Sequence, residues 1–282
     1  MHGNLRFSHW TTNGVTLHCA EAGPEDGRLV ILLHGFPEFW FGWRYQIGEL
    51  ANAGYRVVAP DQRGYNKSTK PAGKAAYAID ILAADVIGLA DALGCGSFAL
   101  IGHDWGGVVG WWIASHYPDR IERFAALNAP HPFAWMDAVR NNPVQRKMSR
   151  YIGFFQMPWL PEFVLRRDHF KALTEAFRQS RRPGAFTDAD LAQYRAAWSE
   201  PGALTAMLNW YRKPITAVSQ PPIAVPVLVV WGMRDAYLVP ELAEASAKLC
   251  ARASVTSLEE ATHWVQYDAT ERVNARLLEF LK

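Results

Sequence analysis

The segment 102–107, with the sequence GHDWGG, places one carboxylate, Asp104, between small residues. An apolar run (98–101) precedes it and a stretch of helical character (108–117) follows it. This pattern is typical of a nucleophile elbow, a tight strand-to-helix turn that pushes its central side chain into a cleft. The usual central residue is serine. A carboxylate attacks amides poorly, but it displaces a leaving group from saturated carbon well, because water can later cleave the resulting ester.

A capping role is the alternative for Asp104, because aspartate is favoured at helix N-caps. The elbow pattern alone leaves capping and catalysis equally open. Two partners decide between them: a base that activates water against the ester, and an acid that orients this base.

His263 and Asp235 are the predicted base and orienting acid. His263 lies in the sequence EEATHWV (259–265), after the last predicted strand, and Asp235 ends the sequence VWGMRD (230–235) after another. Each alone could be an ordinary loop histidine or turn aspartate. The chain order nucleophile, acid, histidine is nevertheless the order expected for this turn on a parallel sheet, and it favours catalysis. His103, which precedes the nucleophile, is expected to face away from it.

The segment 34–38, HGFPE, is the predicted oxyanion turn and follows the predicted strand 28–33. The backbone N–H groups of Phe36 and Trp105 are expected to face the charge that forms when water attacks the ester. Pro37 has no N–H and restricts the local turn, with either a cis or a trans bond.

Strand-like and helix-like segments alternate along the chain, and these elements must position the residues above. The predicted strands are 28–33, 55–59, 98–101, 124–127, 226–230 and 254–258, and the predicted helices are 39–53, 79–93, 108–117, 241–249 and 263–281. Segments 5–11 and 15–21 meet at Asn13-Gly14 and predict an antiparallel hairpin. The alternation predicts an α/β fold, with a mostly parallel sheet flanked by helices.

Between residues 133 and 219 the strand-like runs disappear. This segment carries 13 Lys and Arg against 7 Asp and Glu, a local charge of +6, which leaves −4 for the rest of a chain of net charge +2. We predict a hydrolase core of residues 1–132 plus 220–282, and a helical cap, residues 133–219, over the strand ends where ligands bind in open α/β sheets. A solvated helix surface explains the basic excess better than anion steering does.

Composition limits the classes of protein that fit. A chain of 282 residues that is 50% hydrophobic can bury one large core with an inserted module. An aromatic content of 13% suits an aromatic-lined pocket and equally suits core packing. A net charge of +2 gives no electrostatic case for nucleic acid.

Cysteine spacing and hydropathy bear on the compartment. Cys19, Cys95 and Cys250 lie far apart, without disulfide or metal-site spacing, as expected in a reducing environment. The first ten residues lack the apolar run of a signal peptide, and the longest apolar stretch (98–114) is interrupted by His103 and Asp104. We expect a cytoplasmic monomer or homodimer with no metal, nucleic-acid or membrane partner.

The motifs together resemble the α/β-hydrolase superfamily, and within it the epoxide hydrolases. The matching segments are HGFPE (34–38), WRYQ (43–46), GYRV (54–57), GHDWGG (102–107), Asp235 and THW (262–264). The resemblance implies that Tyr151 and Tyr211 of the cap hold and protonate an epoxide oxygen while Asp104 attacks carbon. Phenols can donate hydrogen bonds to such an oxygen as charge develops. Asn66 is a departure, because related enzymes often carry glycine there.

The resemblance further implies a detoxifying hydrolase that converts a small apolar epoxide and water into a vicinal diol without a cofactor. The residues expected to contact the substrate are Trp105, Phe36, Pro37, Phe155 and Gln156.

Two competing functions share much of this pattern. Haloalkane dehalogenases have the same nucleophile and a following tryptophan, but need a second side-chain donor near the oxyanion turn, where Phe36 donates nothing. A ligand-binding relative without turnover would be expected to lack one catalytic group, whereas all five are present here. A peptidase or esterase would need a serine at the elbow.

Overall fold

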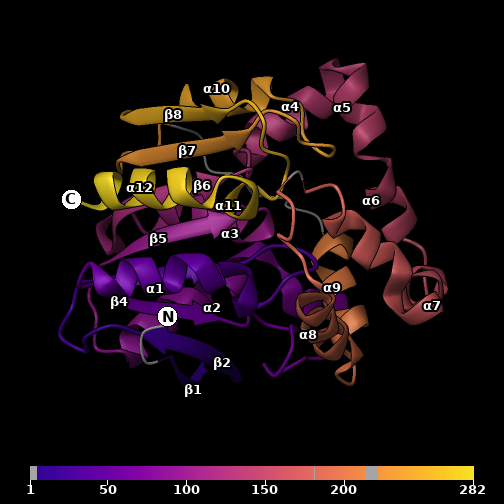
Figure 1. Cartoon of the computed structure of the whole chain (residues 1–282), viewed down its shortest axis with the longest axis horizontal. Coiled ribbons are helices and arrows are strands. Elements are labelled where there is room, and N and C mark those ends of the chain that lie inside the picture. Colours follow the sequence, from indigo (N-terminus) through magenta and orange to yellow (C-terminus); the bar gives the residue numbers. More distant parts are fainter. Residues whose placement is uncertain (1–4, 181, 214–221) are drawn as a thin grey trace.

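The computed structural model describes residues 5–180, 182–213 and 222–282. Its centre is an eight-stranded sheet with the order β1-β2-β4-β3-β5-β6-β7-β8 (Figure 1). The strands are β1 (Arg6–Thr12), β2 (Val15–Ala22), β3 (Leu29–Leu33), β4 (Arg56–Pro60), β5 (Phe98–His103), β6 (Ile121–Leu127), β7 (Val227–Gly232) and β8 (Ala253–Leu258). β2 pairs antiparallel with β1 and β4, as the predicted hairpin requires, and the other pairs are parallel. The predicted α/β fold class is confirmed.

The central strands of the sheet are buried on both faces, and alternate residues along them supply two separate cores. In β3, Leu29, Ile31 and Leu33 join one core, whereas Val30 and Leu32 join the other. The first core contains residues of α2 (Ile79–Ala92), α3 (Trp105–His116) and α10 (Glu241–Ala247). The second contains residues of α1 (Arg44–Asn52), α11 (Val265–Asp268) and α12 (Thr270–Leu281). Helices therefore cover both faces, with α1, α11 and α12 on one side (Figure 1).

Two predicted helices differ from those observed. The helix predicted over 39–53 begins as a 3-10 turn, η1 (Trp40–Trp43), and becomes α1 at Arg44. The prediction of a single helix over 263–281 was wrong. Two helices, α11 and α12, are separated by the non-helical backbone of Ala269, where φ is −131°. His263 precedes α11 and lies in a loop. Its neighbour Thr262 donates from its backbone N–H to the Asp268 carboxylate at 2.7 Å, which closes this loop onto α11.

Between β6 and β7 the described chain contains six helices and no strand. They are α4 (Pro132–Asn141), α5 (Pro143–Met148), α6 (Arg150–Phe155), α7 (Leu160–Phe177), α8 (Asp188–Ser199) and α9 (Ala203–Arg212). The backbone of α7 leaves helical geometry from Arg167 to Phe170, so this helix is kinked. Most of this helical insertion lies beyond one end of the sheet (Figure 1). The predicted boundary at 219/220 lies outside the described residues.

None of the helices among residues 5–180, 182–213 and 222–282 combines the length and the apolar character needed to cross a membrane.

Candidate active site

Asp104 sits at a sharp turn between β5 and α3, with φ +49° and ψ −121°. Close packing explains the surrounding glycines: a Cβ on Gly102 would lie 2.4 Å from the Gly106 carbonyl oxygen, and one on Gly35 would lie 2.4 Å from the Asp104 Cβ. Asp104 occupies the N-cap position of α3, but its side chain makes no capping hydrogen bond. The carboxylate is therefore directed elsewhere.

The Asp104 carboxylate is held between a backbone amide and an imidazole. Its Oδ1 accepts a hydrogen bond from the Phe36 N–H at 2.8 Å, and its Oδ2 lies 3.6 Å from Nε2 of His263. Burial opposes ionisation, but the hydrogen bond and charge of His263 and the Phe36 amide outweigh it and hold the pKa of Asp104 below its usual range. Asp104 is thus ionised and able to act as a nucleophile at neutral pH.

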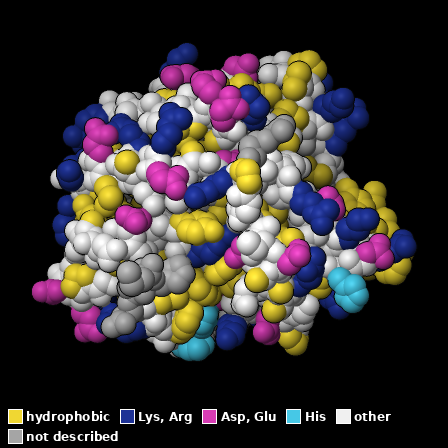
Figure 2. Space-filling model, viewed as in Figure 1, with side chains coloured by type: hydrophobic (Ala, Val, Ile, Leu, Met, Phe, Trp, Pro, Cys, Tyr) yellow, Lys and Arg dark blue, Asp and Glu magenta, His cyan; other side chains and the backbone are white. Residues whose placement is uncertain are grey.

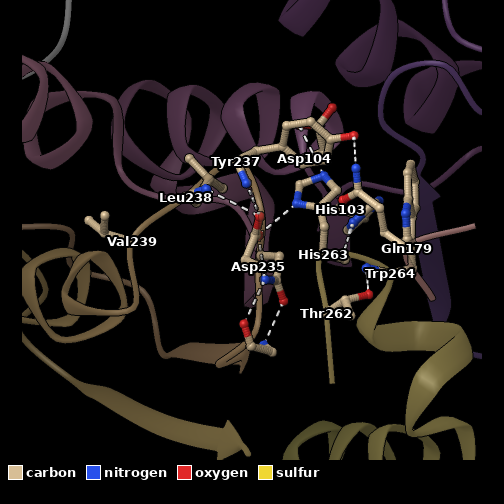
Figure 3. Close-up of polar contacts among 12 residues, drawn as sticks. His103, Asp104, Gln179, Asp235, Tyr237, Leu238, Val239, Thr262, His263 and Trp264 are labelled. Carbon is tan, nitrogen blue, oxygen red and sulfur yellow. Dashed lines mark hydrogen bonds and ion pairs between the residues drawn. The ribbon is translucent and has the colours of Figure 1, made fainter. Parts of the chain in front are cut away.

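His263 is paired on its other side with Asp235, whose Oδ2 lies 2.7 Å from Nδ1 of the ring. The other oxygen of Asp235 accepts hydrogen bonds from the backbone N–H groups of Tyr237 at 2.7 Å and Leu238 at 3.1 Å. Figure 3 shows Asp235 at the centre of these contacts, with His263 beside it. The three residues predicted from elbow, strand end and terminal loop lie in one row: Asp104, His263, Asp235.

The charge state of His263 follows from its two carboxylate neighbours. Burial lowers the pKa of the imidazole, but the charge and hydrogen bonds of Asp235 and Asp104 outweigh burial and raise it to about 10. In the resting protein His263 is therefore protonated at neutral pH, and it cannot accept a proton until one carboxylate charge is removed.

Asn128, which was not predicted from the sequence, also positions Asp235. This residue follows β6, adopts φ +39°, and donates from its amide to Oδ2 of Asp235 at 2.7 Å. Its amide oxygen accepts the Gly232 N–H at 2.8 Å, which ties the ends of β6 and β7 together. A polar residue directly after a buried strand is the signal that could have identified it.

Behind His263 lies a buried network around Glu38, the last residue of the HGFPE segment, which was also missed. The His103 ring lies 3.2 Å from Glu38 Oε2 on one side and 2.9 Å from the carbonyl oxygen of His263 on the other. The hydroxyls of Tyr194 and Tyr267 donate to Glu38 Oε1, that of Tyr194 at 2.8 Å. Burial raises the pKa of Glu38, but these partners outweigh it and keep the pKa low. The network joins the oxyanion turn, the elbow and the His263 loop.

Tyr151 and Tyr211 reach the same region from α6 and α9. Their ring centroids are 5.9 Å apart, and the Tyr211 ring lies 5.1 Å from that of Trp105. Burial, reinforced by the negative charge of Asp104, raises the pKa of both phenols. Both hydroxyls therefore stay protonated at neutral pH and remain hydrogen-bond donors.

Asp104, Tyr151 and Tyr211 line one cavity of about 510 Å³. Its wall is mainly apolar and contains Asp104, Trp105, Val108, Pro130, Pro132, Trp135, Met136, Tyr151, Ile152, Gly153, Gln156, Tyr211, Lys213 and Leu238. The lining thus comes from both the core and the helical insertion. It suits a small apolar ligand whose polar atom meets the tyrosines and Asp104.

The residues predicted to contact a substrate divide into two groups. Trp105 and Gln156 line the cavity, and Gln156 also donates to the backbone carbonyl of Tyr211 at 2.7 Å. Phe36, Pro37 and Phe155 are not among the residues that line this cavity. Phe36 and Phe155 pack against the Tyr211 ring with centroid separations of 5.2 and 5.0 Å, and the Phe36–Pro37 bond is cis.

No cluster of three or more metal-ligating side chains occurs among the residues that the structure describes.

Similarity to known proteins shows the family to which this chain belongs. A family model for the alpha/beta hydrolase fold matches residues 28–270. The chain belongs to the alpha/beta hydrolase family. It is 46% identical over 274 residues to the AB hydrolase superfamily protein YfhM of Bacillus subtilis, covering 96% of each chain. It is 38% identical to human Epoxide hydrolase 4, covering 96% of this chain and 76% of the relative.

Solved structures of this hydrolase family show the same arrangement of the chain. The crystal structure of an epoxide hydrolase from Bacillus megaterium in complex with an inhibitor matches with a TM-score of 0.90 and 34% identity, covering 97% of this chain and 99% of that one. An Epoxide Hydrolase A from Mycobacterium thermoresistibile matches with a TM-score of 0.84 and 32% identity, covering 99% and 98%.

Proposed function

We propose that this hydrolase converts small apolar epoxides into vicinal diols through a covalent ester on Asp104. One observation carries the proposal: an ionised carboxylate from the core and two protonated phenols from the helical insertion line the same cavity. A carboxylate supplies the nucleophile for saturated carbon, and the phenols supply donors for the oxygen that leaves it. Relatives named epoxide hydrolases support the same reaction.

In the first step an oxygen of Asp104 attacks an epoxide carbon, and the carbon–oxygen bond of the ring breaks. The departing oxygen receives hydrogen bonds from Tyr151 and Tyr211 and takes a proton from one of them. The product is a 2-hydroxyalkyl ester of Asp104 and one phenolate.

In the second step water cleaves this ester. Esterification removes one of the two carboxylate charges that hold the pKa of His263 at about 10, so the ring can pass its proton to the tyrosine phenolate and then act as a base. His263 takes a proton from water, and the hydroxide attacks the ester carbonyl. The Phe36 and Trp105 N–H groups stabilise the resulting oxyanion.

His263 then passes its proton to the departing ester oxygen, which completes the diol. The proton left on the Asp104 carboxyl passes to His263, which is again protonated. The sum is epoxide plus water giving diol, and every group regains its starting state. The mechanism needs no metal and no cofactor.

The helical insertion acts in this proposal as a cap, residues 133–219, on a core of residues 1–132 plus 220–282. The core supplies nucleophile, base and acid, and the cap supplies Tyr151 and Tyr211. Trp105 and Gln156 contact the bound substrate. Phe36 and Phe155 pack against the Tyr211 ring.

Intact mass spectrometry of the His263→Gln variant tests the function. The variant is incubated with a panel of apolar epoxides and matched haloalkanes. Because it forms the ester but cannot cleave it, we expect an adduct equal to one whole epoxide, mapped to Asp104 by peptide analysis.

An adduct equal to a haloalkane minus hydrogen halide would identify a dehalogenase instead. A folded variant that forms no adduct with any compound of the panel would contradict Asp104 as the nucleophile. The His263→Gln, Asp104→Asn double variant is the matched control, and it should remain unmodified.

A further inference from the structure

An apolar surface covers the junction of α6 and α7. Four of the eight large hydrophobic side chains that are exposed among the described residues lie between positions 157 and 164. They are Met157 (46% exposed), Trp159 (73%), Phe163 (60%) and Val164 (38%). We call these four residues the α6–α7 patch. Figure 2 shows hydrophobic side chains gathered at the edge of the molecule where α6 and α7 lie, with Lys and Arg and some Asp or Glu beside them.

Exposed basic residues flank this patch along the sequence. Residues 144–172 contain six Lys and Arg and two acids, a local charge of +4. The six basic side chains are exposed: Arg146, Lys147, Arg150, Arg166, Arg167 and Lys171. One of the two acids, Glu162, is already paired with Arg212 at 2.7 Å. The Arg167 guanidinium lies 6.0 Å from the centroid of the Phe163 ring, next to the patch.

The patch adjoins the wall of the active-site cavity. Gln156, which directly precedes Met157, lines that cavity. Arg212, which directly follows Tyr211, donates to the carbonyl oxygens of Phe155 at 2.9 Å and Met157 at 2.8 Å. The patch is thus fixed to the helix that carries one of the two phenols.

We infer that the α6–α7 patch docks on an anionic lipid surface, with Trp159 and Phe163 in the interface and the neighbouring Arg166 and Arg167 on the headgroups. Exposed aromatic side chains next to basic residues are a combination that binds peripheral proteins to anionic membranes. A second copy of this chain fits less well, because segment 144–172 carries a charge of +4 in each copy and the two segments would repel each other.

This inference departs from the expectation of no membrane partner. That expectation rested on the absence of an apolar span, whereas docking needs only a surface. It deepens the proposed function in one respect: apolar epoxides partition into lipid, and a docked enzyme would present its cavity wall to their reservoir. Lipid binding itself does not depend on the epoxide assignment.

Vesicle co-flotation with the full chain tests the proposal. Vesicles of phosphatidylcholine and phosphatidylglycerol in equal parts are compared with pure phosphatidylcholine at about 0.05 M and about 0.5 M NaCl. We expect binding to the anionic vesicles at low salt and at least about tenfold weaker binding at high salt or without phosphatidylglycerol.

Three variants localise the contact. Trp159→Ser/Phe163→Ser and Arg166→Glu/Arg167→Glu should each weaken vesicle binding by about tenfold or more. Phe7→Ser is the matched control, because Phe7 is 53% exposed on β1, and this variant should bind as the wild type does. Hydrolysis of a water-soluble epoxide, or ester formation where turnover is absent, should be unchanged in all three.

Failure of the wild type to bind anionic vesicles at low salt would overturn the proposal, as would unchanged binding by both patch variants. A wild-type dimer in sedimentation velocity that Trp159→Ser/Phe163→Ser dissociates would also overturn it in favour of a second copy. None of these results affects the adduct mass expected for His263→Gln, so vesicle binding tests the lipid proposal and the adduct mass tests the epoxide proposal independently.

Discussion

The sheet edge and the helical insertion contribute different kinds of group to one cavity. Asp104, Asp235 and His263 follow strands, and backbone N–H groups and buried polar partners hold their side chains. Tyr151 and Tyr211 stand on helices, and aromatic rings surround them. The groups that are charged in the resting protein thus follow strands of the sheet, whereas the donors that are neutral in the resting protein come from the helical insertion.

The insertion itself has two unlike halves. Its second half is bonded to the core: Trp198 donates to the Pro37 carbonyl at 2.6 Å, Trp210 to the Arg63 carbonyl at 3.0 Å, and Tyr194 to Glu38 at 2.8 Å. Its first half holds the exposed hydrophobic residues Phe133, Val144, Met157, Trp159, Phe163 and Val164. The second half is therefore bonded to the HGFPE segment. The first half is bonded to the core through Gln145, which contacts the backbone of Tyr237 and Val239, and it carries these exposed side chains.

The largest effect is expected at the nucleophile. Asp104→Asn keeps the shape of the side chain and tolerates the positive φ of this turn, but it removes the attacking charge. We expect kcat for epoxide hydrolysis to fall by about 10⁴-fold or more, measured from diol formation. An unchanged circular dichroism spectrum shows that the variant folds, and substantial activity in freshly purified protein would contradict the mechanism.

The two phenols should matter less individually than the nucleophile. Tyr151→Phe or Tyr211→Phe removes one donor to the departing oxygen and leaves the other, so ring opening should slow by about 10–100-fold. The double variant should lose about 10³-fold or more, measured as the rate of ester formation in single-turnover experiments. Full activity in the double variant would refute the epoxide assignment. Tyr117→Phe, an exposed tyrosine outside the site, is the matched control.

The charged row at the sheet edge should also make stability depend on pH. The pKa of His263 is raised from 6.5 to about 10 in the folded chain, so protonation favours folding. This contribution is fully present below about pH 6.5 and is lost as the pH rises through about 10.

Melting temperatures between about pH 7 and about pH 10 measure this contribution. The decline should be steeper for the wild type than for His263→Gln, which has no ring to titrate. Parallel curves for the two proteins would show that His263 is not held protonated between its two carboxylates.

The smallest effect is expected for a hydrogen bond between the helical insertion and the HGFPE segment. Trp198→Phe retains most of the buried ring but leaves the Pro37 carbonyl without the indole donor, at a cost of about 1–3 kcal/mol in the free energy of unfolding. Urea unfolding measures this loss. An unchanged free energy of unfolding would mean that the anchor adds nothing to stability, and Trp112→Phe, partly exposed on α3, serves as the control.

Much of the fold could be predicted from particular residues. Asn13-Gly14 predicted the hairpin, and the spacing from Ile79 to Leu93 predicted α2, because turn chemistry and helical periodicity are local properties. The break at Ala269 was missed, since the apolar spacing of 263–281 continues across it. The spacing of apolar residues alone does not predict where the backbone changes direction between two helices.

The candidate site divides in the same way. Asp104, Asp235 and His263 could be named because each follows a strand, and parallel strands bring their carboxyl ends to one edge. Tyr151 and Tyr211 were named by family resemblance, because nothing local distinguishes them from the other tyrosines. Glu38 and Asn128 have partners far away in sequence, and only packing reveals them.

Local chemistry in the chain was therefore enough to specify a nucleophile elbow on an α/β sheet and the order of its charged partners. Tertiary structure decided which side chains share the cavity, that Glu38 lies buried behind His263, and that Trp159 and Phe163 remain exposed. The reason is physical: turn and strand preferences act between neighbours, whereas burial, pKa and surface exposure depend on residues that meet only when the chain is folded.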